Sequence, residues 1–112
     1  SVGTARHAVD VASDKLASDV VMLDLRGVAD FTDFFVVLTV ESSRQMDSVA
    51  QDIESAVEDL GARLHHKEGT AHSGWVLLDF SDVIVHVFRT ESREFYNIED
   101  AWSGALETVR IQ

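Results

Sequence analysis

Residues 74–88, GWVLLDFSDVIVHVF, form the most apolar part of the chain and constrain its fold most strongly. Two short runs rich in β-favouring side chains, residues 75–80 and 83–88, flank the polar pair Ser81 and Asp82. Short apolar runs joined by a two-residue polar link are typical of a β-hairpin, although this link lacks the glycine that such turns favour. We therefore expect a hairpin at the centre of a sheet, with Trp75 half buried at its open end.

Two segments have the apolar spacing of amphipathic helices. In residues 4–17, alanines and other apolar residues recur at helical intervals behind Thr4, a candidate N-cap. A second apolar stripe lies between a cap at Ser42 or Ser43 and a helix-ending Gly61. Five carboxylates occupy the opposite side of this second helix, which predicts a solvated face: Asp47, Asp52, Glu54, Glu58 and Asp59.

The remaining segments complete an alternating pattern of strands and helices. Residues 34–40, FFVVLTV, are apolar at nearly every position, which is typical of a strand covered on both faces. The order α-β-β-α-β-β-β-α predicts one α/β domain with a mixed sheet. The other expected segments are strands at residues 20–25 and 62–67, a polar loop at 68–73 hinged on Gly69, short helical turns within 90–102, and a tail of uncertain order at 104–112.

The charge of the chain restricts its partners. Its 112 residues include 20 acidic and 9 basic side chains, for a net charge of −11. Such a protein is repelled by phosphate, which argues against direct nucleic-acid binding. The charge suits a basic protein partner, or it serves solubility alone. The absence of cysteine excludes disulfides and thiolate metal sites and fits a cytoplasmic location, and no apolar run has the length of a membrane span.

The sequence gives little support for catalysis or metal binding. It lacks a Walker A loop, G-x-G-x-x-G and G-x-S-x-G. His65, His66 and His72 lie close together, but the first two would point to opposite faces of a strand, so we predict no metal site. Asp79 and Asp82 could hold Mg²⁺, yet aspartates beside turns more often bond local backbone N–H groups.

Three passages in this order resemble the ribosomal silencing factor family, RsfS or Iojap: TDFFVVLTVESSRQ, WVLLDFSDVIVHVF and ESREFYNIEDAW. The resemblance covers residues 10–102 and implies a single domain at 1–102 with a C-terminal tail at 103–112. It also implies a five-stranded mixed sheet flanked by helices, distantly similar to the nucleotidyltransferase fold but without its catalytic carboxylates.

The function that this resemblance implies is non-enzymatic and needs no cofactor. Members of the family bind the large ribosomal subunit through its fourteenth protein, a basic protein at the subunit interface. Bound there, they block joining of the small subunit and repress translation when nutrients are scarce. The resemblance also implies a cytoplasmic protein and, as for some members, a homodimer.

Nine residues are the expected docking surface for the ribosomal protein. The resemblance places five residues directly on this surface: Trp75, Leu77, Asp79, Phe80 and Ser81. Four more match family positions that shape or extend it: Asp82, His86, Arg93 and Tyr96. The pair Phe80 and Ser81 departs from the family's usual Tyr-Gly. Two other hypotheses stay open, a nucleotidyltransferase-like enzyme that uses Asp79, Asp82 and a divalent metal, and a plain dimerisation module.

Overall fold

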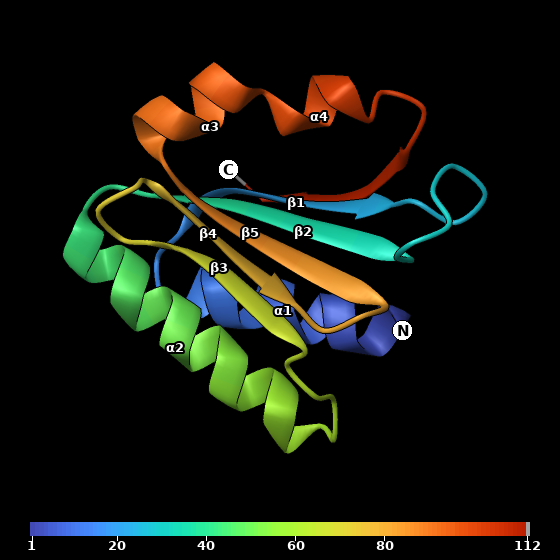
Figure 1. Cartoon of the computed structure of the whole chain (residues 1–112), viewed down its shortest axis with the longest axis horizontal. Helices are drawn as coiled ribbons and strands as arrows, with labels where there is room; N and C mark the ends of the chain where they lie inside the picture. The colour runs from blue at the N-terminus through green and yellow to red at the C-terminus, as the bar shows by residue number, and fades with distance from the viewer. Residues whose placement is uncertain (112) are drawn as a thin grey trace.

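The computed structural model describes residues 1–111, which fold around one six-stranded sheet of order β3-β4-β5-β2-β1-β6 (Figure 1). The elements follow one another as α1 (Val2–Asp14), β1 (Ser18–Asp24), β2 (Phe34–Val40), α2 (Ser43–Asp59), β3 (His66–Thr70), β4 (Trp75–Asp79), β5 (Val83–Arg89), α3 (Thr90–Tyr96), α4 (Ile98–Ala101) and β6 (Leu106–Ile111). The predicted mixed α/β class is confirmed. No helix among residues 1–111 is long and apolar enough to cross a membrane.

The two central strands are parallel, and all other neighbouring strands are antiparallel. β2 pairs with β5 from Phe34 opposite Val83 to Val40 opposite Arg89. Every residue of β2 is buried, as the continuous apolar run predicts. β4 and β5 form the predicted hairpin, with Trp75 opposite Phe88 at its open end.

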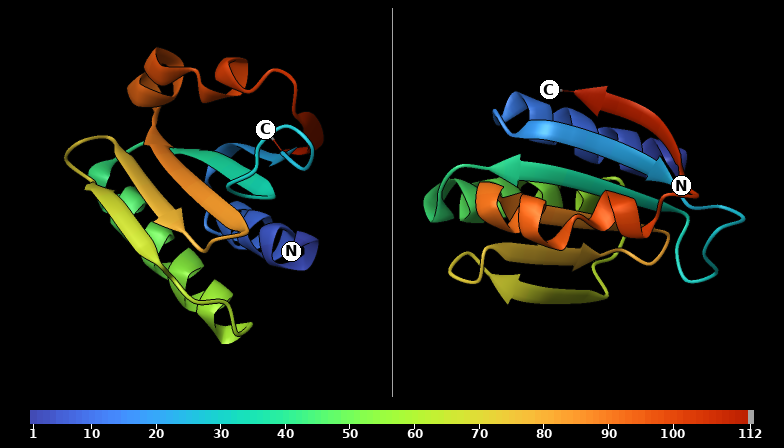
Figure 2. Two further views of the ribbon diagram at one scale, coloured as in Figure 1. Left: turned by 45° about the vertical axis from the view of Figure 1, so that its right-hand side comes forward. Right: turned by 90° about the horizontal axis from the view of Figure 1, so that it is seen from above.

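Helices cover the two faces of the sheet differently, as Figures 1 and 2 show. α1 and α2 lie side by side on one face, where small α1 side chains such as Ala5 and Ala8 allow close packing. Ser42 caps α2 by accepting a hydrogen bond from the Gln45 N–H at 3.1 Å, and Gly61 follows the helix with a φ of +93°. α3 and α4 lie on the other face, joined at Asn97, whose φ of 43° ends α3.

Two segments differ from the prediction at the edges of the sheet. The first edge strand is His66–Thr70 rather than residues 62–67, so Gly69 lies inside β3 instead of a loop. Its φ is +83°, and a Cβ there would stand 1.9 Å from the Trp75 carbonyl oxygen, so only glycine fits. At the other edge, residues expected as a tail form β6, which pairs with β1 and raises the strand count from five to six. Gln112 lies outside the described residues.

β6 joins the domain through ion pairs as well as through strand pairing. The Arg110 guanidinium contacts Glu99 of α4 at 3.0 Å and also pairs with Asp19 of β1. The alternation of β-favouring Val109 and Ile111 with polar residues fits an exposed edge strand.

Candidate functional site

The alternation of side chains along β4 divides the expected docking residues between two faces. Trp75 and Leu77 are half buried on the α3 side of the sheet. Phe80, which follows β4, packs with Val76 and Leu78 against the α1–α2 side and is only 3% exposed. Because successive strand residues point to opposite faces, Phe80 belongs to the core, which corrects its expected role as a docking contact.

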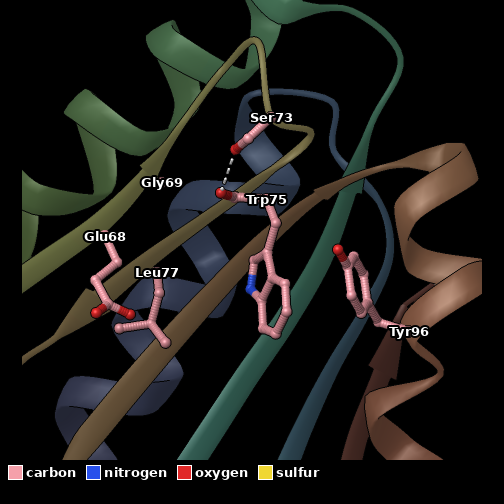
Figure 3. A pocket seen from close by; sticks show the side chains of 6 residues that line it. All are labelled: Glu68, Gly69, Ser73, Trp75, Leu77 and Tyr96. Atoms are coloured by element: carbon pink, nitrogen blue, oxygen red, sulfur yellow. Dashed lines mark hydrogen bonds between the residues drawn. The ribbon is translucent and has the colours of Figure 1, made fainter.

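Trp75, Leu77 and Tyr96 line an open pocket of about 260 Å³ together with Glu68, Gly69 and Ser73 (Figure 3). Tyr96 of α3 is 48% exposed, and its ring centroid lies 4.6 Å from that of Trp75. Phe95 is 80% exposed and packs edge-on against Tyr96 at 5.0 Å. We call this apolar region, which Glu68 borders, the Trp75 surface: Glu68, Trp75, Leu77, Phe95 and Tyr96.

His86 lies directly beneath the Trp75 surface, opposite Leu77 on β5. It is 3% exposed, and its Nδ1 accepts a hydrogen bond from the indole N–H of Trp75 at 3.2 Å. The ring of Phe35 stands edge-on to the imidazole at 4.5 Å. Burial lowers the pKa of His86 to about 3, so the ring is neutral at physiological pH. Its burial excludes a direct contact with a partner, which corrects its expected place among the docking residues.

Arg93 is also buried, and it anchors α3 to the sheet. Its guanidinium donates to the Asp19 carbonyl at 2.7 Å, to Thr39 Oγ1 at 2.8 Å and to Glu99 Oε1 at 2.8 Å. Its hydrogen bond is the largest of the effects that lower the pKa of Glu99. Because Arg93 is only 7% exposed, it shapes the site by fixing the helix that carries Tyr96.

Asp79, Ser81 and Asp82 lie at the other end of the β4–β5 hairpin, about 13 Å from Trp75 along the strand. The Asp79 carboxylate accepts the Ser81 N–H at 2.7 Å, which is the local turn role predicted for it. Ser81 has a φ of 79°, where the family resemblance places glycine. The structure therefore separates these three residues from the Trp75 surface.

Metal ligands do not converge in the part of the chain that the structure describes. No three histidine or acidic side chains among residues 1–111 are placed to hold an ion. His66 instead pairs with Glu68 at 3.0 Å on the exposed strand β3.

Sequence reasoning missed two members of the Trp75 surface. Phe95 lies in the segment predicted only as short helical turns, and Glu68 belongs to β3 rather than to the predicted loop. The adjacent aromatics Phe95 and Tyr96 carry a usable signal, because neighbouring residues of a helix diverge by about 100° and cannot both face the sheet.

Comparison with known proteins gives the family. A family model described as "Ribosomal silencing factor during starvation" matches residues 1–112. The chain belongs to the ribosomal silencing factor family. It is 35% identical over 105 residues to ribosomal silencing factor RsfS of Halalkalibacterium halodurans, covering 94% of this chain and 89% of that protein. It is 34% identical over 98 residues to RsfS of Bacillus subtilis, covering 88% and 83%.

A crystal structure of a Chromobacterium violaceum protein has the same fold as this RsfS-family chain. The two superpose with a TM-score of 0.86 at 27% identity, covering 97% of this chain and 90% of that one. The relatives' names describe regulatory factors rather than enzymes.

Proposed function

We propose that this chain represses translation by docking its Trp75 surface on the fourteenth protein of the large ribosomal subunit. The bound domain would then occupy space that the small subunit needs for joining. The observation that carries the proposal is the aromatic surface that exposed Phe95 and Tyr96 form beside half-buried Trp75, on a chain of the ribosomal silencing factor family. Such a mechanism requires a rigid, well-placed body and no catalytic chemistry.

The composition of the Trp75 surface supports a protein partner. Tryptophan and tyrosine are enriched among residues that dominate binding energy at interfaces. Both rings sit on fixed supports, since Trp75 belongs to a paired strand and Tyr96 to the helix anchored by Arg93. A preorganised surface loses less conformational entropy on binding than a mobile one.

The charge of the chain supports a basic partner in the cytoplasm, where ribosomes work. Glu68 lies opposite Leu77 at the border of the Trp75 surface, and the whole chain carries −11. Opposite potentials accelerate encounter with a basic ribosomal protein, whereas ribosomal RNA repels the chain. Salt should therefore weaken the association.

Co-sedimentation with purified subunits tests the proposal. The chain should pellet with large subunits and not with small ones, and a higher salt concentration should reduce the bound fraction. In a parallel joining assay, it should reduce the yield of assembled ribosomes. Absence of large-subunit binding at low salt would refute the proposal, and the mass of the free protein would show whether it is a homodimer.

Matched aromatic variants locate the docking surface. Tyr96→Ala should lower affinity for large subunits by about 2 kcal/mol, as loss of an interface anchor does. Phe31→Ala is the control, since Phe31 is an exposed aromatic of similar accessibility, 53% against 48%, that contacts Trp102 instead of Trp75. Trp75→Ala should lower affinity by roughly 2–4 kcal/mol while the domain stays folded. Equal binding by the Tyr96 and Phe31 variants would place the docking surface elsewhere.

A further inference from the structure

The indole N–H of Trp75 is already used inside the protein. It donates to His86 Nδ1 at 3.2 Å, from the edge of the ring that faces away from Tyr96 in Figure 3. An indole has one polar hydrogen and no acceptor. A partner that reaches the Trp75 surface therefore finds aromatic carbon at this residue and no free hydrogen-bond donor.

The same hydrogen bond fixes the tautomer of His86. Because Nδ1 accepts, the neutral ring carries its hydrogen on Nε2. Nε2 is buried and has no hydrogen-bond partner among the described residues. An unsatisfied buried donor is costly, and phenylalanine would fill a similar space without that cost. Phenylalanine, however, cannot accept a hydrogen bond from the indole N–H. The need for an acceptor such as Nδ1 therefore explains why a histidine occupies this apolar position.

We propose that His86 is the positioning residue of the Trp75 surface. Its Nδ1 sets the rotation of the indole and leaves only aromatic carbon for the docking partner. This inference rests on the proposed function, and it adds a restriction on the partner's chemistry. The partner must meet Trp75 with apolar groups or with the flat face of a cationic side chain, and hydrogen-bond acceptors gain nothing there.

Packing alone restrains the indole only in part. Phe88 lies 4.9 Å from the Trp75 ring and Tyr96 lies 4.6 Å from it, both at tilted angles. These contacts bound the ring on two sides but do not select which edge points inward. The directional bond to His86 makes that selection, because hydrogen bonds weaken steeply away from linearity.

Nuclear magnetic resonance of the uniformly ¹⁵N-labelled chain tests the hydrogen bond directly. We expect a scalar coupling between Trp75 Nε1 and His86 Nδ1, transmitted through the shared hydrogen. The His86 nitrogen shifts should show a bare Nδ1 and a protonated Nε2. A protonated Nδ1, or no coupling in the folded protein, would overturn the inference whatever the ribosome-binding result.

A double-mutant cycle tests the positioning role with large-subunit affinity as its readout. His86→Phe should weaken binding about tenfold, and His86→Asn, whose amide oxygen lies near the former Nδ1, should restore most of that loss. In a Trp75→Phe background, which lacks the N–H, the His86→Phe change should cost no further affinity.

The outcomes separate this inference from the proposed function. Lack of large-subunit binding by the unmodified chain would refute the proposed function. The scalar-coupling measurement would still show whether the hydrogen bond between Trp75 and His86 exists. Normal binding by a folded His86→Phe variant would overturn the positioning role alone. If His86→Phe lowers large-subunit affinity equally in the Trp75 and Trp75→Phe backgrounds, the positioning role is also overturned, because the effect would then come from packing and not from the indole N–H.

Discussion

The two faces of the sheet are built from different chemistry. The face under α1 and α2 is a continuous apolar core of mostly small and aliphatic residues, joined by Phe34 and Phe80. The face toward α3 and α4 contains buried polar groups, His86 and Arg93 among them, and ends in the exposed Trp75 surface. Buried polar groups cost free energy unless they are satisfied, so their concentration on one face agrees with the docking role proposed for that face.

The largest expected effect is at Arg93, which supports the α3 face from within. Arg93→Ala should lower the free energy of unfolding by about 3–5 kcal/mol, because Glu99 and the Asp19 carbonyl lose a buried charged partner. Urea denaturation measures the change. Lys15→Ala is the control, since its pair with Asp52 is exposed and should contribute less than about 1 kcal/mol. Equal effects would mean that the Arg93 network does not anchor α3.

Neighbouring leucines on β4 compare the two faces within one strand. Leu78 is fully buried in the α1–α2 core, so Leu78→Ala should lower the free energy of unfolding by about 3 kcal/mol. Leu77 is half buried in the Trp75 surface, so Leu77→Ala should cost only about 1 kcal/mol of stability. Ribosome pelleting should show the reverse order, with the folded Leu77 variant the weaker binder. Similar results for both leucines would remove the distinction between the faces.

Acid should destabilise the domain through His86, the buried histidine on the α3 face. Folding lowers the pKa of His86 from 6.5 to about 3, so the unfolded chain binds more protons between these values. The neutral buried His86 costs the folded state no stability above pH 6.5. Below pH 6.5 the histidine of the unfolded chain becomes protonated, and the free energy of unfolding falls until the pH reaches about 3. Stability should therefore drop by about 1.5 kcal/mol from pH 6.5 to pH 5, a range above most carboxylate titrations. Chemical denaturation at both pH values should show a smaller drop for His86→Phe, and equal drops would contradict a buried neutral histidine.

The smallest expected effect lies in the hairpin turn, which belongs to neither face. Ser81 adopts a φ of 79°, which glycine tolerates better. Ser81→Gly should raise stability by about 0.5 kcal/mol, since relief of backbone strain is partly offset by the greater freedom of glycine in the unfolded chain. Thermal unfolding measures the change, and large-subunit binding should be unaltered. Weaker binding would extend the docking surface to the turn.

Sequence reasoning predicted the fold better where the pattern was apolar than where it was polar. The stripe of α2 and the continuous run of β2 predict their burial because hydrophobic periodicity decides both. β3 and β6 are exposed edge strands without a continuous apolar pattern, and β6 pairs with β1, which is distant in sequence. The local pattern therefore predicts β3 with the wrong bounds and does not predict β6.

The candidate site was partly predictable for the same reason. Trp75, Leu77 and Tyr96, three of the nine expected docking residues, line one pocket. Phe80 does not, because the period of the strand turns it to the opposite core. The hydrogen bond between Trp75 and His86 joins residues on two paired strands, and only the register of β4 against β5 brings them together.

Site-specific photo-crosslinking on large subunits tests most directly whether the α3 face docks. A photoreactive amino acid in place of Leu77 reports on the Trp75 surface, and the same group in place of Leu60, an exposed leucine that follows α2, is the control. The account predicts that position 77 crosslinks to the fourteenth protein of the large subunit and that position 60 does not. Crosslinking from position 60 alone, or from position 77 to ribosomal RNA instead, would contradict it.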